Sequence, residues 1–388
     1  MKYFYRSVCV LGMVCLPALS LVAQKSAPNS LQVGAPFLMI NPDPRTSAVG
    51  SAMTGIAPNV NDLLGNSAKI AFAGDWGIGA SYSPWLYELN NDNTQSAVAY
   101  LSGFKSFNGK EAIGASLRYM SHGTVTFRDD NGQQLSNYKP REFAIDATYA
   151  RKLGDHYSLG VSLRYIRSDL GEGTYNGIQQ KAASAVAGDV GFYYQNYADH
   201  IDFGNRYCWG ISFSNIGSKL SYSDDDNKKT FLPMNLKIGG GYTFVHTTEH
   251  TFTIALDINK LLIPTPPQYE LDDQGFPTDV IIKGKDPDRS VVESIFSSFG
   301  DAPGGFKEEI KELTFATGVE YAYREQLFIR AGYFYENELK GHRQHASLGA
   351  GFRLKPFEIN MAYIMPTDGT MYQTRTFKLG LLVNMYAD

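Results

Sequence analysis

Segments of about ten residues, in which apolar side chains alternate with small or polar ones, recur along the sequence after residue 75. In residues 113–119, for example, Leu117 and Arg118 belong to opposite series. Residues 159–165 and 315–324 repeat the scheme. Successive side chains of a β-strand point to opposite faces, so a period of two predicts strands whose faces meet different surroundings.

Fourteen segments show this alternation, and the even number suits a closed antiparallel barrel of the bacterial outer membrane. The chain holds 25 Tyr, 23 Phe and 38 Gly, yet after the N-terminal segment it has no apolar run of about 18 residues that would form a membrane-spanning helix. The pattern predicts lipid on one face of the strands and a lumen on the other. The predicted strands cover 76–87, 96–107, 111–127, 142–152, 156–170, 187–199, 207–217, 234–244, 250–261, 313–323, 327–336, 345–354, 357–365 and 374–386.

The connections between these segments alternate between short and long. Short turns are predicted at 108–110, 153–156, 245–250, 323–325 and 354–356, with a longer one at 199–206. Long loops are predicted at 128–141, 171–186, 218–233 and 262–312. Outer-membrane barrels have short periplasmic turns and long external loops. We therefore predict an all-β fold, a 14-stranded antiparallel transmembrane β-barrel over residues 76–388, located in the outer membrane with its long loops extracellular.

A soluble β-sandwich or lectin-like barrel is the alternative. Such a fold would carry many Lys and Glu residues on its face away from the core. Here the apolar face carries aromatic residues near the strand ends, as an interfacial girdle does: Tyr119, Tyr165, Tyr323, Tyr335 and Tyr363. Phe328 and Phe334 belong to the other face, so the girdle supports the membrane barrel without deciding for it.

Residues 1–23 have the form of a secretory signal peptide. Lys2 and Arg6 precede a short apolar run at 8–16, and a cleavage point follows Ala23. Cys9 and Cys15 would leave with this peptide, so the mature chain would keep Cys208 alone and form no internal disulfide.

Residues 24–75 precede the first strand and differ from everything after it. This segment is rich in Ala, Gly, Ser, Asn and Pro and is nearly free of aromatics. A barrel of fourteen strands has a lumen wide enough to need filling. We predict that the segment is a plug in the lumen, held by Arg118, Arg164, Lys237 and Arg353 of the wall. A disordered periplasmic tail is the alternative, but the apolar clusters at 37–40 and 63–64 do not favour it.

The stretch "PFLMINPDPRTSAVGSAMTGIAPNVNDLLGNSAKIAF" resembles the N-terminal signature of the PorV/PorQ group, outer-membrane proteins of the type IX secretion system. Ser67 departs from the signature, which usually has proline there, and this leaves the turn less constrained. The positions that match are Phe37, Leu38, Ile40, Asp43, Arg45, Gly50, Ala52, Ala57, Asp62, Asn66 and Ala68.

The resemblance implies a barrel like that of the long-chain fatty-acid transporters (FadL-like), with fourteen strands and an N-terminal plug. It also implies a role as a cargo shuttle. In that role the protein receives secreted cargo with a C-terminal signal domain from the large translocon barrel. It delivers the cargo to a surface attachment complex that contains a sortase-like protease, and it performs no covalent chemistry itself.

The sequence provides no pattern for catalysis, for a cofactor or for a metal. The G-x-S strings lie within predicted strands, and His342 and His345 have no neighbouring cysteine that would make a zinc site. The acidic stretches at 128–134 and 223–229 lack the spaced ligands of a calcium loop. The net charge of −4 gives no electrostatic reason to expect nucleic acid.

The loop at 262–312 is the longest one predicted. After the stiff "PTPPQY", Ser290 and Glu293 form a capping-box pattern ahead of a short helix, and a second helix is predicted at 304–313. The first helix would carry its apolar side chains on one face. That face either binds a partner or folds down over the barrel mouth. Its residues are Val291, Val292, Ile295, Phe296 and Phe299.

Three functions remain to be compared. A secretion shuttle binds partners and transports no solute, whereas a transporter of hydrophobic small molecules needs a continuous apolar path. The inward faces favour Gly, Ser and Arg, together with Asp257 and Asn360, although Ile166, Phe328 and Leu382 are apolar. A purely structural barrel would make no use of so large a loop. The sequence favours the shuttle, in contact with outer-membrane lipid.

Overall fold

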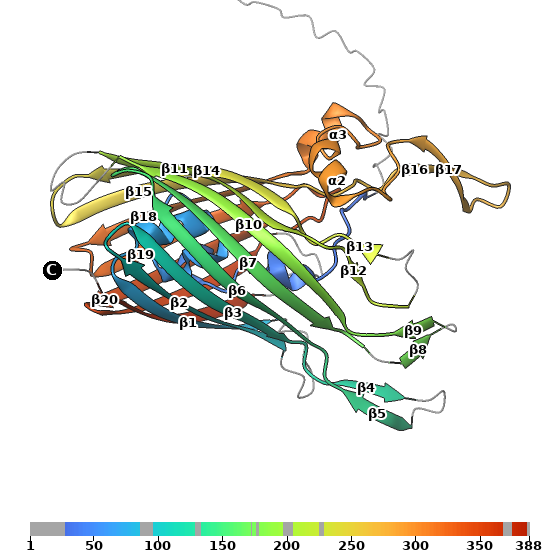
Figure 1. Ribbon diagram of the computed structural model, residues 1–388, viewed down its shortest axis with the longest axis horizontal. Helices are drawn as coiled ribbons and strands as arrows, with labels where there is room; N and C mark the ends of the chain where they lie inside the picture. The colour runs from blue at the N-terminus through green and yellow to red at the C-terminus, as the bar shows by residue number, and fades with distance from the viewer. Residues whose placement is uncertain are drawn as a thin grey trace, which may run out of the picture.

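The structure is a computed structural model that describes residues 28–85, 96–128, 133–171, 173–175, 178–196, 205–224, 229–367 and 375–385. Within these residues, fourteen antiparallel strands form a closed barrel, and β1 completes the ring by pairing with β22 (Figure 1). The strands are β1 (Trp76–Trp85), β2 (Ser96–Phe107), β3 (Glu111–Ser121), β6 (Arg141–Lys152), β7 (Tyr157–Asp169), β10 (Ala183–Gln195), β11 (Arg206–Gly217), β14 (Asn235–Val245), β15 (His250–Leu261), β18 (Leu313–Tyr323), β19 (Leu327–Tyr335), β20 (His345–Leu354), β21 (Phe357–Pro366) and β22 (Thr376–Met385). The predicted fold class is confirmed.

The two faces of the strands divide as the alternation predicts. In β3, the outward side chains of Ile113 and Leu117 are 49% and 36% exposed, whereas the inward Ser116 and Arg118 are each 5% exposed. Outward aromatic residues lie near both ends of the barrel. Tyr157, Phe192, Tyr194, Tyr207 and Trp209 form a chain of ring contacts at the end where β7 begins. This arrangement is what an aromatic belt at a membrane interface requires.

The barrel has a short-turn end and a long-loop end. The connections at 108–110, 153–156, 246–249, 324–326 and 355–356 are short, as predicted, and all lie at the short-turn end. The long-loop end extends into two-stranded hairpins beyond the barrel (Figure 1). They are β4 (Val125–Arg128) with β5 (Gln134–Tyr138), β8 (Gly173–Tyr175) with β9 (Ile178–Gln180), β12 (Leu220–Ser221) with β13 (Lys229–Thr230), and β16 (Gln268–Leu271) with β17 (Pro277–Lys283).

Two predicted strands differ from the structure by more than two residues at an end, whereas the others agree within two residues. The segment predicted at 111–127 is interrupted after Ser121, because Gly123 has a φ of 79° and turns the chain away from the barrel. The segment predicted at 187–199 begins at Ala183 instead. Ala183, Ala185 and Ala187 all face inward, and their small side chains conceal the alternation in the sequence.

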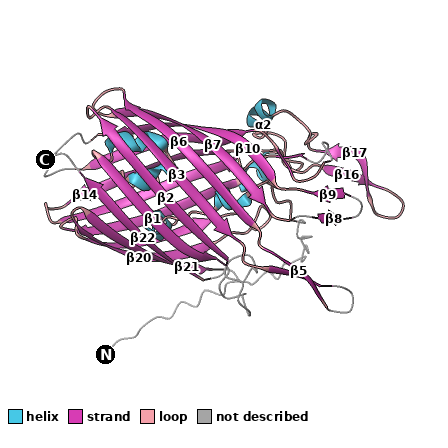
Figure 2. Cartoon of the chain, turned by 60° about the horizontal axis from the view of Figure 1, so that its bottom comes forward, coloured by secondary structure: helices cyan, strands magenta, loops and turns pink. Residues whose placement is uncertain are grey.

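The segment before β1 lies inside the barrel (Figure 2). It contains four short helices that were not predicted from the sequence: η1 (Pro36–Met39), α1 (Pro44–Ala48), η2 (Val60–Leu64) and η3 (Ser67–Phe72). We call residues 28–75 the plug segment. The expected signal peptide, residues 1–23, lies outside the described residues.

The loop at 262–312 carries both predicted helices. They are α2 (Val291–Ser297) and α3 (Phe306–Lys311), and we call residues 290–312 the arm. The arm lies at the long-loop end beside the β16–β17 hairpin (Figure 1). Within the described residues, no helix combines the length and the apolar character needed to cross a membrane.

Candidate functional site

Side-chain caps fix three of the four short helices of the plug segment, α1, η2 and η3. Asp43 is the N-cap of α1, and its carboxylate accepts from the Thr46 backbone N–H at 2.9 Å and from Asn61 Nδ2 at 2.8 Å. Asn59 and Asp62 form a capping box at η2. Asn66 caps η3 through the Ala68 N–H at 3.1 Å. These Asp and Asn residues, each ahead of a short helical run, are a sequence signal for α1, η2 and η3, which were not predicted.

Buried charges hold the plug segment together. Lys69 Nζ lies 2.7 Å from Asp62 and donates to the carbonyls of Met53 and Ile56. Arg45 donates to the Ala57 carbonyl at 2.8 Å and lies 3.7 Å from Glu320 of the wall. A charge in such an interior needs partners of this kind, since an uncompensated one costs several kcal/mol. Lys69 was not singled out from the sequence, although its side chain is fully buried.

The residues of the signature motif meet in this interior. Asp43, Arg45, Gly50, Asp62, Asn66 and Ala68 are all buried. Phe37 and Leu38 pack with wall residues of β2, β3 and β7, and Ile40 packs against the same cluster while half-buried. These nine of the eleven signature residues therefore lie at contacts within the plug segment or between it and the wall.

Polar side chains of the wall satisfy the backbone of the plug segment. Asp257 accepts from the backbone N–H groups of Met53 and Thr54 at 2.7 and 3.2 Å. Ser347 donates to the Ala48 carbonyl at 3.0 Å and accepts from the Gly50 N–H at 3.1 Å. Backbone groups removed from water need such partners, so these contacts specify where the plug segment lies. Three further wall residues donate to it: Ser158 to the Ala68 carbonyl, Ser212 to the Gly65 carbonyl and Lys378 to Ser47 Oγ.

The predicted set of wall cations is correct in part. Arg118 donates to the Leu38 carbonyl at 2.6 Å, and Lys237 lies 3.2 Å from Met53 Sδ. Arg164 instead pairs with Asp146 and Asp189 of the neighbouring strands, and Arg353 pairs with Glu358. The prediction was wrong for these two because a cross-strand carboxylate offers an inward arginine a nearer partner than the plug segment does.

Glycines of the wall allow the plug segment to approach closely. A Cβ added to Gly332 would overlap the backbone of Val49 and Gly50. Gly50 itself has a φ of 66°, which L side chains rarely adopt, and the backbones of Thr317 and Tyr333 lie against it. Glycine is therefore required on both sides of this contact. The same kind of contact joins Gly241 to Gly55.

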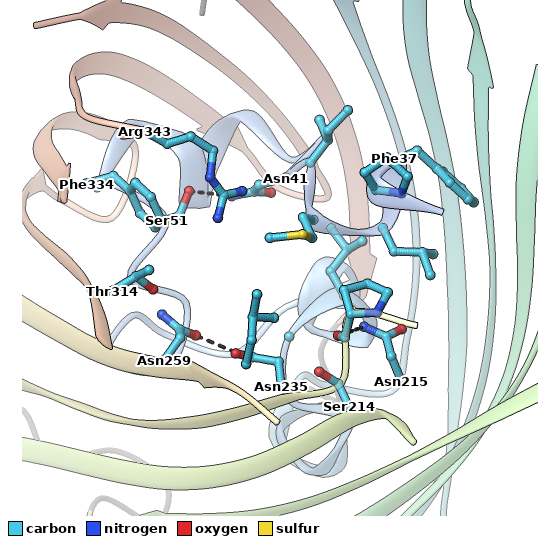
Figure 3. A pocket seen from close by; sticks show the side chains of 18 of the residues that line it. Phe37, Asn41, Ser51, Ser214, Asn215, Asn235, Asn259, Thr314, Phe334 and Arg343 are labelled. Atoms are coloured by element: carbon cyan, nitrogen blue, oxygen red, sulfur yellow. Dashed lines mark hydrogen bonds between the residues drawn. The ribbon is translucent and has the colours of Figure 1, made fainter. Parts of the chain in front are cut away.

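A cavity of about 540 Å³ lies between the plug segment and the long-loop end (Figure 3). The plug segment contributes an apolar side to it. Asn215, Asn235 and Asn259 stand among the polar residues around it (Figure 3). The cavity thus combines an apolar surface with polar and charged walls. The apolar residues of the plug segment that line it include Phe37, Leu38, Met39, Ile40, Met53 and Leu64.

Ion pairs fix the arm to the rim of the barrel. Lys340 contacts Glu308 at 2.6 Å and Glu312 at 3.0 Å, and Lys260 contacts Glu309 at 3.0 Å and Glu312 at 2.7 Å. Burial opposes the charge of Glu308, but hydrogen bonds, led by the one from Lys340 Nζ, hold the pKa of its carboxyl below the ordinary value. The arm is therefore held at a defined place and is not a free tether.

The predicted apolar residues of α2 divide into two groups. Val291 and Ile295 pack against the buried cluster of Phe231, Met234, Leu262 and Ile263 at the rim. Val292, Phe296 and Phe299 are 65%, 75% and 52% exposed. Ser290 caps the helix, as the sequence indicated, by accepting from the Glu293 N–H at 3.2 Å. The helix thus covers part of the rim and leaves Val292 and Phe296 uncovered, as is Phe299, which follows the end of the helix.

The described residues do not bring three His, Cys, Asp or Glu side chains together as a metal site would. His345 stacks on Phe334 with ring centroids 5.2 Å apart. Cys208 is buried and donates weakly to the Thr54 carbonyl at 3.6 Å.

Comparison with known proteins gives one family and one fold. A family model described as "Type IX secretion system protein PorV" matches residues 23–268, which is more than half of the chain. No curated protein matches. Among solved structures, the deltaS2S3 mutant of the monoaromatic hydrocarbon channel TodX is 12% identical, with a TM-score of 0.52 over 88% of this chain and 97% of its own.

Two further structures are similar at lower scores. The toluene transporter TbuX of Ralstonia pickettii is 11% identical, with a TM-score of 0.48 over 88% of this chain and 98% of its own. A FadL homologue of Pseudomonas aeruginosa is 11% identical, with a TM-score of 0.44 over 92% of this chain and all of its own. At these identities the likeness concerns the fold alone.

Proposed function

The chain belongs to the family of the type IX secretion system protein PorV, and from that premise we propose that it is the outer-membrane cargo shuttle of this system. In this role it binds secreted proteins through their C-terminal signal domain. It takes them from the large translocon barrel to the surface complex that contains the sortase-like protease. The protein itself makes and breaks no covalent bond.

The observation that carries this proposal is the exposed apolar edge of α2. Val292 and Phe296 are exposed on a helix whose inner edge packs on the rim, and ion pairs hold the neighbouring α3 of the same arm. Burying an apolar side chain of this size contributes about 1.5–3 kcal/mol, so a partner that covered both would gain a useful share of its affinity. The β16–β17 hairpin adds further exposed apolar side chains: Leu271, Phe276, Val280 and Ile282.

The plug segment supports a binding role over a conducting one. Its carbonyls and N–H groups are matched to wall residues such as Asp257 and Ser347, and its backbone presses on wall glycines such as Gly332. Moving it would break these contacts together. A shuttle needs no such movement, because its partners bind outside the barrel.

Transport of hydrophobic small molecules is the second candidate, and the cavity above the plug segment is the reason to keep it. Its apolar side includes Phe37 and Leu38. The similar barrels named as hydrocarbon channels or toluene transporters point in the same direction. Polar residues such as Asn235 and Lys237 line the rest of the cavity, so its apolar surface does not form a continuous path.

One extraction experiment distinguishes the two functions. The tagged protein is extracted from its native membrane in mild detergent, and all co-purifying proteins and lipids are identified by mass spectrometry. The shuttle predicts near-stoichiometric recovery of secreted proteins that share a C-terminal domain. Apolar small molecules recovered without protein partners would support the transporter instead.

A matched pair of variants tests the surface itself. Phe296→Asp places a charge on the exposed edge of α2 and is expected to reduce cargo recovery at least tenfold, since about 1.4 kcal/mol corresponds to a factor of ten. Leu153→Asp is the control, because Leu153 is 59% exposed at the short-turn end. Equal recovery with both variants would remove α2 from the binding surface.

A further inference from the structure

An apolar groove runs between the arm and the outer wall of the barrel. Its volume is about 250 Å³. The wall side consists of outward residues of β14, β15 and β18, and the arm side consists of residues from α3 and from the turn before it. The groove is lined chiefly by Ile238, Ile258, Phe299, Phe306, Ile310 and Leu313.

The groove is continuous with the lipid-facing surface of the barrel. Ile238 of β14 and Ile258 of β15 are register partners. Ile258 belongs to the same outward series of β15 as the lipid-facing Ile254 and Leu256. Ile238 is 49% exposed. The arm side continues this apolar surface, with Phe306 77% exposed and Ile310 49% exposed. Side chains of this size at the edge of a membrane belt face acyl chains more favourably than water.

Lys260 places the arm at the boundary of the membrane. It faces outward, two residues along β15 from Ile258, yet its side chain is buried because Glu309 and Glu312 of the arm cover it. A lysine facing hydrocarbon is costly unless it is paired. The arm therefore shields a charge where the lipid-facing wall ends, and the paired Lys260 and Glu309 form part of the lining of the groove.

We propose that this groove holds an acyl chain of a membrane lipid from the leaflet nearest the long-loop end. The wall supplies one side of the chain's environment, and Phe299, Phe306 and Ile310 supply the other. The groove recognises the chain rather than the headgroup, because the nearby Lys260 and Lys340 are both engaged by Glu309 and Glu312. Val292 and Phe296 do not line the groove, so they remain available to a protein partner.

Nitroxide labels on the full mature chain test the location of the arm. Ile310→Cys, Ile238→Cys and Phe276→Cys are labelled singly in a Cys208→Ala background and inserted into phosphatidylcholine vesicles. Ile238 lies on the lipid-facing wall, and Phe276 lies on the β16–β17 hairpin, 63% exposed. Power-saturation measurements compare access for oxygen, which concentrates among acyl chains, with access for a water-soluble nickel chelate.

The label at 310 is expected to behave like the label at 238, with oxygen access exceeding nickel access, while the label at 276 shows the reverse. A label at 310 that resembles the one at 276 would place the arm in water and overturn the proposal. Exclusion of both reagents at 310 would also overturn it, because a second copy of the chain would then cover the groove. For each variant, resistance to unfolding by dodecyl sulfate without heating, seen as a shifted band on electrophoresis, verifies that the barrel is intact.

A second measurement tests occupancy of the groove. Spin-labelled phosphatidylcholine in contact with the protein gives a motionally restricted spectral component. Ile310→Trp fills the groove and is expected to reduce this component, whereas Phe276→Trp leaves it unchanged. An identical restricted component in both variants would contradict binding of a chain in the groove, whatever the outcome for cargo.

Discussion

At the scale of single residues, Asp257 links the wall to the plug segment through two backbone hydrogen bonds. Its carboxylate accepts two plug N–H groups, and Lys237 lies 4.0 Å from it. Asp257→Ala leaves both N–H groups unpaired, and each is expected to cost about 1–3 kcal/mol. Guanidinium unfolding in detergent micelles, followed by tryptophan fluorescence, measures the loss.

Asp257→Asn is the matched control for this change. The amide keeps one oxygen that accepts from the same N–H groups, so a smaller loss of stability is expected. If the alanine and asparagine variants unfold at the same denaturant concentration, the hydrogen bonds to the plug segment do not carry the effect.

The second prediction at this scale concerns Gly332. Gly332→Ala drives a methyl group into the backbone of Val49 and Gly50, and overpacking of this kind costs about 1–3 kcal/mol. The plug segment should loosen, and trypsin should cut it after Arg45 or Lys69, which are buried in the native protein. Gly103→Ala is the control, because the nearest atom to its added Cβ is 3.7 Å away. Equal protection of both variants would argue against the close contact.

At the scale of elements, the arm depends on charges contributed by separate loops. Lys340, from the connection between β19 and β20, contacts two glutamates of the arm. Removing one partner from charged hydrogen bonds costs about 1.5–3 kcal/mol. Lys340→Met should therefore increase amide hydrogen exchange in α3, as measured by mass spectrometry.

Lys307→Met provides the comparison, since Lys307 is exposed on the same helix. It removes the same charge and adds the same side chain without touching the buried glutamates. Exchange in α3 that rises equally in both variants would mean that the ion pairs do not hold the arm.

At the scale of the whole molecule, the asymmetry of the barrel predicts its orientation. Short turns gather at one end and hairpins at the other, and outer-membrane barrels place the long loops outside. In a Cys208→Ala background, Phe276→Cys should react with a membrane-impermeant maleimide on intact cells. Leu153→Cys, at a position that is 59% exposed at the short-turn end, should react only after lysis. The reverse pattern would invert the orientation.

The sequence alone determined the barrel. Alternation is a local property of each strand, so fourteen strands and their inward and outward faces could be read without knowing the pairing. The missed boundary at Ala183 has a physical reason. The inward alanines at the start of β10 pack around Phe37 and Leu38. Because the plug segment fills the space beside them, these positions carry small side chains that hide the alternation.

The tertiary structure alone decided how the plug segment is held and where the apolar loop residues face. Asp257 and Met53 are 204 residues apart in sequence, and no local pattern connects them. Arg164 and Phe299 were likewise candidate residues from the sequence. Only the structure shows that Arg164 pairs with Asp146 of the neighbouring strand and that Phe299 lines the groove beside the outer wall. Faces follow from the geometry of one strand, whereas contacts follow from the closure of the whole barrel around its plug segment.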